Sequence, residues 1–173
     1  MDMNRQQLAA QISTRSRLSG DFLLRSGARA TEYFDKYLFE SDPATLRCIA
    51  RHMAELVPPQ TEVLSGLELG GVPIATILSQ ETGLPVYFVR KKQKEYGTCR
   101  LAEGGDIEGR RLLVVEDVVT SGGQIILSVR DLRNLGATVE SAVCVIDRES
   151  GGVEALAAEG VNLSALFRMG ELP

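Results

Sequence analysis

The sequence predicts an α/β fold in which a central parallel sheet is flanked by helices. From about residue 62 onward, short apolar segments alternate with helical segments at the spacing of strands and crossover helices. Residues 112–115 and 142–146 are almost continuously apolar, as in strands that are buried on both faces. With 173 residues and 44% hydrophobic composition, the chain is long enough for one domain around one core. We therefore expect a single domain over residues 1–173.

The first 40 residues precede this alternation and predict an N-terminal appendage. A helix is expected over residues 4–17, with a glycine shortly after it. Segments 21–25 and 33–39 are rich in aromatic and aliphatic residues and flank a polar turn, which predicts a hairpin. The next helix, over residues 42–56, begins with an aspartate cap and a proline in its first turn.

The remaining elements follow in regular alternation. Glycines end two of the predicted helices, as is common at helix C-termini. Residues 91–109 are polar and contain four glycines, which predicts a long exposed loop that can hold short pieces of strand. The expected strands lie at 62–66, 86–90, 112–119, 139–147 and 163–167, and the expected helices at 72–81, 124–135 and 153–159.

Composition excludes several classes of function. The net charge of -4 disfavours a general nucleic-acid surface, and no run of about 18 apolar residues predicts a membrane span. The three cysteines are widely separated, without the spacing of a zinc site or a disulfide framework, so we expect a cytoplasmic protein. The only histidine, His52, lies among apolar residues of a predicted helix, which leaves little room for histidine-based catalysis.

The segment LLVVEDVVTSGG, residues 112–123, carries the strongest functional signal. A buried strand reaches two adjacent acids, Glu116 and Asp117, and a turn of small polar residues then leads into a helix. Glycines and hydroxyls at a helix start suit a phosphate, whereas the acids suit sugar hydroxyls. The spacing of an ATP- or GTP-binding P-loop is missing. The pattern predicts a ribose 5-phosphate ligand, although each piece alone also fits a strand end and a helix cap.

EDVVTSGG resembles the phosphoribosyl pyrophosphate (PRPP) motif of the type I phosphoribosyltransferases. The resemblance implies their fold, with residues 1–40 as a small hood over the base site. It also implies that the two acids contact the ribose 2- and 3-hydroxyls and that the turn holds the 5-phosphate. The implied PRPP-binding residues of this segment are Glu116, Asp117, Val118, Val119, Thr120, Ser121, Gly122 and Gly123.

A second segment, VRKKQKEYG at residues 89–97, concentrates positive charge in an acidic chain. Such a run is often only a solvated surface, but it resembles the flexible catalytic loop of the orotate phosphoribosyltransferase family. The resemblance implies that Arg90, Lys91, Lys94 and Tyr96 bind PRPP, and that Lys91 and Lys94 act in catalysis with Asp117. Tyr96 stands where a histidine is common in that family and cannot become cationic near neutral pH.

The glycine-rich turn GLELGG, residues 66–71, is a weak signal alone because such turns often serve only backbone geometry. Beside the other motifs it resembles the pyrophosphate loop of the same family, in which the amides around Gly70 and Gly71 meet the diphosphate. Some members carry a lysine at the position of Gly70. This chain lacks it, which shifts more of the diphosphate charge to Mg²⁺ and to the loop lysines.

Two further segments resemble the base site of that family. LLRSGARATEYF, residues 23–34, is similar to the hood segment, and VIDRESGG, residues 145–152, is similar to its D-R-x-x-G motif. An arginine fork pairs well with a carboxylate, and orotate is an acidic base. The implied orotate-binding residues are Arg25, Tyr33, Phe34, Thr120 and Arg148.

The resemblance implies transfer of the phosphoribosyl group from PRPP to orotate, giving orotidine 5-monophosphate and pyrophosphate on the pyrimidine (UMP) pathway. It implies Mg²⁺ as cofactor, held mainly by PRPP with water-mediated contact to Glu116 and Asp117. It also implies a homodimer in which loop 91–109 crosses to the partner site, without nucleic-acid or membrane partners. A phosphoribosyltransferase for another base such as a purine, a non-catalytic PRPP-binding regulator, and an unrelated α/β nucleotide-binding domain are the alternatives.

Overall fold

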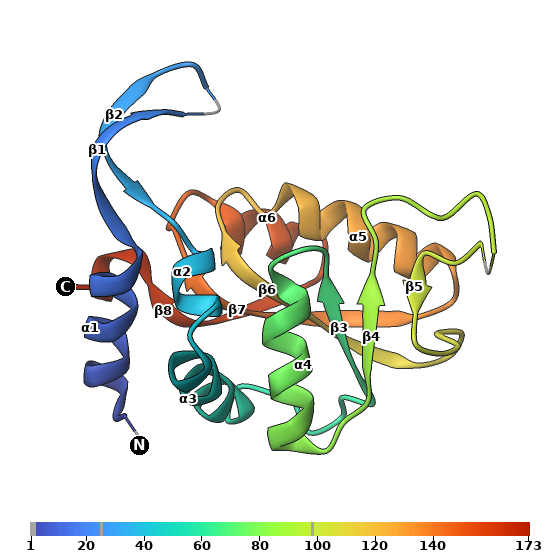
Figure 1. The fold of residues 1–173 in the computed structure, drawn as a ribbon. Coiled ribbons are helices and arrows are strands. Elements are labelled where there is room, and N and C mark those ends of the chain that lie inside the picture. Colours follow the sequence, from blue (N-terminus) through green and yellow to red (C-terminus); the bar gives the residue numbers. More distant parts are fainter. Residues whose placement is uncertain (1–2, 25, 98) are drawn as a thin grey trace.

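The computed structural model describes residues 3–24, 26–97 and 99–173, which form a six-stranded sheet with helices on both faces and a separate hairpin (Figure 1). The sheet order is β5-β4-β3-β6-β7-β8. The strands are β1 Arg17–Leu23, β2 Arg29–Phe34, β3 Val63–Leu67, β4 Val86–Val89, β5 Ala102–Glu103, β6 Arg111–Val119, β7 Thr138–Asp147 and β8 Asn162–Arg168. The helices are α1 Arg5–Ser16, α2 Tyr37–Glu40, α3 Pro43–Ala54, α4 Gly71–Thr82, α5 Gly123–Asn134, α6 Gly152–Ala158 and a short 3₁₀ helix at Met169–Glu171.

The sheet confirms the predicted α/β class. β3, β4, β6, β7 and β8 pair in parallel, and only the two-residue edge strand β5 is antiparallel. One hydrophobic core joins α1, α3 and α4 to one face of the sheet, and a second joins α5 and α6 to the other. The central strand β6 therefore has neighbours on both edges and both faces, which explains its apolar sequence.

The structure corrects three details of the expected elements. β1 begins at Arg17, directly after α1, rather than near residue 21. Residues 37–39, expected in a strand, belong to the helical turn α2, where Asp35 Oδ1 accepts a hydrogen bond from the Tyr37 amide and Phe39 is fully buried. Loop 91–109 is not exposed throughout, because Leu101, Ala102 and Ile107 are buried. Within the described residues, no helix is both long and apolar enough to cross a membrane.

The β1–β2 hairpin is the expected hood, and it extends away from the body of the molecule (Figure 1). None of the residues in either strand is fully buried. The segment after β4 rises at the other end of the same edge of the sheet (Figure 1). Because parallel strands end at that edge, the hood and the basic loop flank the carboxyl ends of the central strands, where α/β folds bind ligands.

Candidate active site

The two acids of the central motif lie near the carboxyl end of β6, inside the strand rather than after it. Asp117 is fully buried and Glu116 is nearly so. A buried carboxylate needs a compensating charge or hydrogen bonds. Asp117 has both, because its Oδ2 lies 2.5 Å from the Lys36 ammonium and its Oδ1 accepts a 2.5 Å hydrogen bond from the Val118 amide.

A third acid, Glu40 at the end of α2, completes this cluster. Burial, followed by the negative charge of Asp117, raises the pKa of Glu40 to about 9. The same two causes raise the pKa of Glu116. Burial alone would lower the pKa of Lys36, but its hydrogen bond to Asp117 and the charges of Asp117 and Glu116 outweigh burial and raise it. The cluster therefore joins the contact between Lys36 and Asp117 to two carboxyl groups, those of Glu40 and Glu116, that hold their protons more tightly than usual.

The turn after β6, which the sequence predicts to be a phosphate cradle, borders an open hollow. Residues 116 and 118–125 line a hollow of about 290 Å³ at the start of α5. Gly122 has φ +77°, a left-handed conformation that favours glycine, and it packs against the loop that starts α6. Thr120 and Ser121 are exposed at this hollow. Hydroxyls and a helix N-terminus that face an open space can receive an anionic group.

The glycines of the turn before α4 let its backbone approach β6. A Cβ atom on Gly71 would lie 2.2 Å from the carbonyl oxygen of Val115. A Cβ atom on Gly70 would lie only 1.4 Å from Oδ2 of Asp117. The start of α4 is therefore pressed against the acidic cluster.

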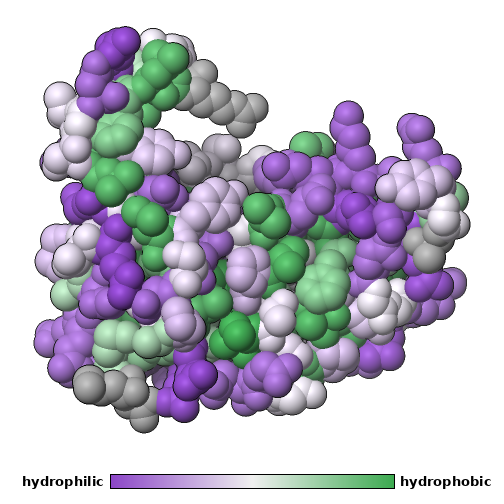
Figure 2. Space-filling view, viewed as in Figure 1, coloured by the Kyte–Doolittle hydropathy of each residue, from purple (hydrophilic) through white to green (hydrophobic). Residues whose placement is uncertain are grey.

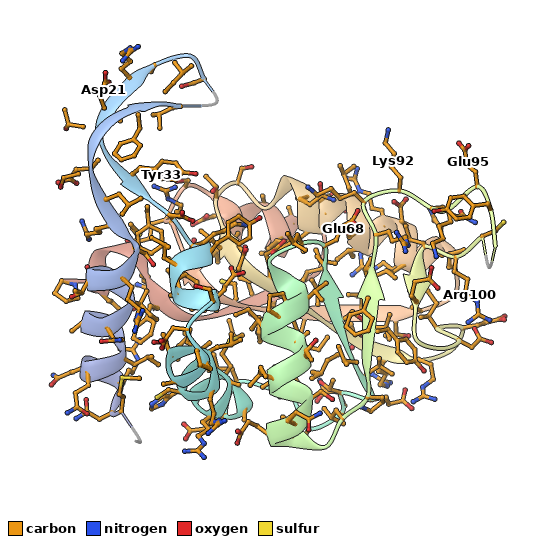
Figure 3. The ribbon with its side chains drawn as sticks, in the orientation of Figure 1. Asp21, Tyr33, Glu68, Lys92, Glu95 and Arg100 are labelled. Carbon is orange, nitrogen blue, oxygen red and sulfur yellow. The ribbon has the colours of Figure 1, made fainter. Side chains whose placement is uncertain are left out.

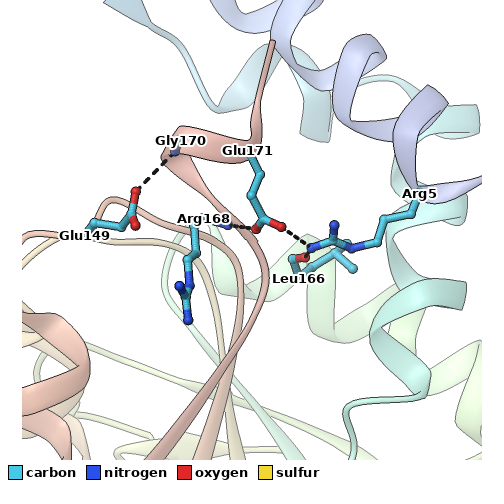
Figure 4. A network of polar contacts seen from close by, with 6 residues as sticks. All are labelled: Arg5, Glu149, Leu166, Arg168, Gly170 and Glu171. Carbon is cyan, nitrogen blue, oxygen red and sulfur yellow. Dashed lines mark hydrogen bonds and ion pairs between the residues drawn. The ribbon is translucent and has the colours of Figure 1, made fainter.

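Arg148 is the first residue after β7 and is exposed next to the cradle. Its amide donates a 2.8 Å hydrogen bond to the Val119 carbonyl. The following residue, Glu149, is braced by the C-terminal segment, because its Oε2 accepts a hydrogen bond from the Gly170 amide (Figure 4). Glu171 in turn accepts from the Arg168 amide at 2.6 Å and pairs with Arg5 of α1 at 3.0 Å (Figure 4). The loop that carries Arg148 is thus tied to the helix that precedes the hood.

The hood residues are placed unequally. Tyr33 is 45% exposed and its ring lies 5.5 Å from that of Phe22. Phe34 points to the other side of the strand, where it packs against Phe39 and the core. Of this aromatic pair, only Tyr33 presents a largely exposed ring (Figure 3). Arg25, the hood arginine expected at the base site, lies outside the described residues.

The basic loop leaves β4 and is held by acidic side chains of the same chain. Lys94 lies 2.9 Å and Arg90 3.3 Å from Oε1 of Glu103 in β5. The Lys91 amide donates a 2.5 Å hydrogen bond to Glu68, at the carboxyl end of β3 (Figure 3). Tyr96 is 74% exposed. The loop starts beside the sheet edge that carries the acids, but Arg90 and Lys94 pair with Glu103 rather than with the acids of β6.

Lys36 and Glu40 are site residues that the sequence analysis missed. Both lie in or next to a four-residue helix, which is too short for a periodic pattern. One signal was available: the chain has only four lysines, and Lys36 is the one outside the basic loop. Among the described residues, no group of three or more histidine, cysteine or acidic side chains is placed to hold a metal ion.

Comparison with known proteins agrees with this geometry. Residues 40–161, most of the chain, match the family model described as the phosphoribosyl transferase domain, which defines the class of fold and site. An orotate phosphoribosyltransferase from a Nocardioides species is 54% identical over 95% of this chain and 92% of its own length. The chain therefore belongs to the orotate phosphoribosyltransferase family.

Solved structures agree with this assignment. The Mycobacterium tuberculosis orotate phosphoribosyltransferase in complex with Fe(III) dicitrate has a TM-score of 0.88 and 33% identity, and the match covers 97% of this chain and 98% of that one. The same protein in complex with PRPP has a TM-score of 0.83 and 30% identity, with the same coverage. The family assignment confirms the expected fold and class of activity.

Proposed function

We propose that the protein transfers the phosphoribosyl group of PRPP to orotate, releasing pyrophosphate and forming orotidine 5-monophosphate, a step in pyrimidine biosynthesis. The observation that carries this proposal is the EDVVTSGG segment at the carboxyl end of β6, with its buried acids and adjoining hollow. The reaction is a displacement at the anomeric carbon through a transition state with oxocarbenium character. No covalent nucleophile is needed, so the protein positions two substrates and stabilises charge.

The residues of the central motif divide this work. Glu116 and Asp117 accept hydrogen bonds from the ribose 2- and 3-hydroxyls, and the negative charge of Asp117 favours the cation that develops on the ribose. Thr120, Ser121 and the amides of the turn through Gly123 hold the 5-phosphate. The amides around Gly70 and Gly71, pressed against the acids, meet the diphosphate. Lys91 and Lys94, with Arg90 and Tyr96, close over the leaving group and exclude water.

The base is held by Arg148 and the hood. Arg148 can bind the orotate carboxylate through two charge-assisted hydrogen bonds, and its connection to Val119 places it beside the cradle. The exposed ring of Tyr33 can cover one face of a flat base, with Phe34 as the packed support behind it. Thr120 and Arg25 complete the proposed orotate site.

Mg²⁺ is the proposed cofactor. It prefers oxygen ligands, keeps several waters, and is usually bound by one or two carboxylates together with substrate phosphates. Glu116 and Asp117 fit this pattern, because they place two acidic side chains next to each other near the carboxyl end of β6. We propose that PRPP holds the ion and that these acids contact it through water. When bound, Mg²⁺ neutralises diphosphate charge.

We further propose a cytoplasmic homodimer in which loop 91–109 serves the partner's site. Hydrophobic side chains gather on the face over α4 and β4 (Figure 2). Leu69, which lies just before α4, and Phe88 of β4 are 64% and 37% exposed. A surface of this kind favours association between subunits. The loop that would cross the interface begins directly after β4. Cys48, Cys99 and Cys144 are all free thiols, which suits a reducing compartment.

The test is an assay of purified protein with PRPP and Mg²⁺ against orotate, hypoxanthine, adenine and uracil. We expect loss of orotate absorbance that requires both PRPP and Mg²⁺, with little product from the other bases. Arg148→Ala should raise the KM for orotate while leaving that for PRPP nearly unchanged. A purine preference would overturn the assignment of Arg148, and PRPP binding without turnover of any base would indicate a regulator.

A further inference from the structure

Lys36 is a charged residue at the candidate site to which none of the roles above is assigned. It precedes α2, and its ammonium lies 2.5 Å from Oδ2 of Asp117, the acid nearest the start of α4. Its side chain is one-third exposed, whereas that of Asp117 is 1% exposed. The lysine therefore reaches from the surface to the buried acid and keeps part of its side chain accessible to a ligand.

The segment that carries Lys36 is fixed to the body of the protein. The Asp35 amide donates a 2.8 Å hydrogen bond to the Ser16 carbonyl at the end of α1. The Tyr37 amide is capped by Asp35, and Phe39 is completely buried in the core. Because both ends of this turn are anchored, the position of the lysine is set by the fold rather than by a mobile surface chain.

The ammonium contacts Asp117 at a point where Gly70 of the glycine-rich turn has no room for a side chain. A Cβ atom on Gly70 would collide with the same oxygen of Asp117 that Lys36 contacts. The turn 66–71 contributes no cationic side chain of its own. A diphosphate that approaches the start of α4 therefore meets Lys36, whose ammonium is already held in place there by Asp117. An ammonium has three donors, and the contact with Asp117 uses one of them.

We propose that Lys36 is a substrate-binding residue that donates to the diphosphate of PRPP, with Asp117 as the residue that positions it. This inference rests on the proposed function, because it needs PRPP as the ligand. Lys36, at the start of α2, then supplies to the diphosphate the positive charge that the turn before α4 lacks. The loop lysines then meet the diphosphate from the solvent side, and Lys36 meets it from the side of the acids.

The experiment compares Lys36→Met, Lys36→Arg and the control Arg130→Met. Arg130 lies on α5, has no role in the proposed site, and pairs with Glu159 at the end of α6. Equilibrium binding is measured by calorimetry with two ligands, PRPP and ribose 5-phosphate, which lacks the diphosphate. We expect Lys36→Met to weaken PRPP about 10- to 100-fold, as for loss of a charged contact, and ribose 5-phosphate less than about threefold. Lys36→Arg should restore most of the PRPP affinity, and Arg130→Met should match the wild type.

Three outcomes would overturn the proposal. Parallel losses for both ligands would show that Lys36 only supports the fold or the position of Asp117. Tighter binding of either ligand would show that the lysine is a counter-ion that substrate displaces. Unchanged PRPP affinity would remove it from the site. Turnover of orotate by the wild type tests the proposed function separately, because the binding comparison needs no base.

Discussion

The carboxylate of Asp117 is the point where separate segments of the chain meet. Lys36 and Glu40 approach it from α2, the Val118 amide from its own strand, and Gly70 from the start of α4. Each neighbour restricts where the others can lie, because losing the cation beside a buried carboxylate, or forcing another atom against it, destabilises the folded protein. Substitutions at these positions should therefore act on the site through Asp117.

Gly70→Ala should damage the site although alanine is a small side chain. The added Cβ atom would lie 1.4 Å from Oδ2 of Asp117, so the carboxylate and its lysine must move. We expect PRPP affinity to fall at least tenfold and the free energy of unfolding to fall by about 1–3 kcal/mol, as for overpacking. Calorimetry and urea denaturation measure the two effects.

Gly123→Ala is the matched control for stability. Its Cβ atom would find only Ser121 Oγ, at 3.7 Å, and alanine is favoured over glycine in a helix. The free energy of unfolding should stay within about 0.5 kcal/mol of the wild type or rise. Equal destabilisation by both substitutions would contradict the role given to the contact between Gly70 and Asp117.

Glu40→Gln should reduce the dependence of stability on pH. Burial and the charge of Asp117 raise the pKa of Glu40 to about 9 in the folded protein, whereas it is about 4.3 in an unfolded chain. Between these values the folded state binds more protons, so the contribution of Glu40 to stability is full below about pH 4.3 and is lost as pH rises through about 9. Urea denaturation at pH 6 and at pH 9 should show that the free energy of unfolding falls less between these two pH values in the variant than in the wild type. An identical loss would mean that Glu40 is ionised in the folded protein.

At the scale of elements, loop 91–109 is held by contacts that are easily exchanged. The ion pairs of Lys94 and Arg90 with Glu103 are partly exposed, and such pairs contribute about 0–1 kcal/mol. They keep the cations near the sheet edge without locking them there. A diphosphate that carries several negative charges can compete with one carboxylate for the same lysine.

Lys94→Ala should therefore act on the rate rather than on ground-state binding. The charge that Lys94 meets is greatest when the diphosphate leaves, so we expect kcat to fall about 100-fold and the Kd for PRPP to change less than about threefold. The control is Lys92→Ala, which removes an exposed lysine of the same loop (Figure 3). Steady-state kinetics measures kcat, and calorimetry measures the Kd for PRPP. An unchanged kcat would remove Lys94 from catalysis.

The elements that the sequence predicted well are those with long patterns. β6 and β7 are apolar over many residues, and the helices that follow strands have clear ends, so their order and the parallel sheet were predictable. The two-residue strand β5 and the four-residue helix α2 are too short to show a period, and their conformation is set by tertiary contacts. The EDVVTSGG segment was recognisable because it is one continuous motif. The contact between Lys36 and Asp117 was not, because it joins two segments that are far apart in the sequence.

At the scale of the whole molecule, the hood and the basic loop rise at opposite ends of one sheet edge (Figure 1). Arg90 and Lys94 pair with Glu103 rather than with the β6 acids. This arrangement supports the proposal that a second subunit supplies the loop. A homodimer with exchanged loops has two identical sites, each built from both chains.

Mixing two variants that are each impaired at low orotate concentration tests this arrangement. Lys94→Ala subunits lack the loop lysine and Arg148→Ala subunits lack the base arginine. In a mixed dimer with crossing loops, one site combines both wild-type residues. After subunit exchange at low orotate concentration, we expect about a quarter of wild-type activity, because half of the dimers are mixed and half of their sites are intact. If each loop serves its own subunit, mixing adds nothing to the separate activities.

The exposed hood has one more consequence, which concerns local opening. Both strands of the β1–β2 hairpin lack buried residues, so few apolar contacts oppose the separation of their backbones. Such a segment opens with far less free energy than the global transition. Its amide hydrogens should exchange with deuterium long before those of β6 and β7, and a ligand that fills the base site should slow them. The hairpin thus reports base occupancy in a protein that is not turning over.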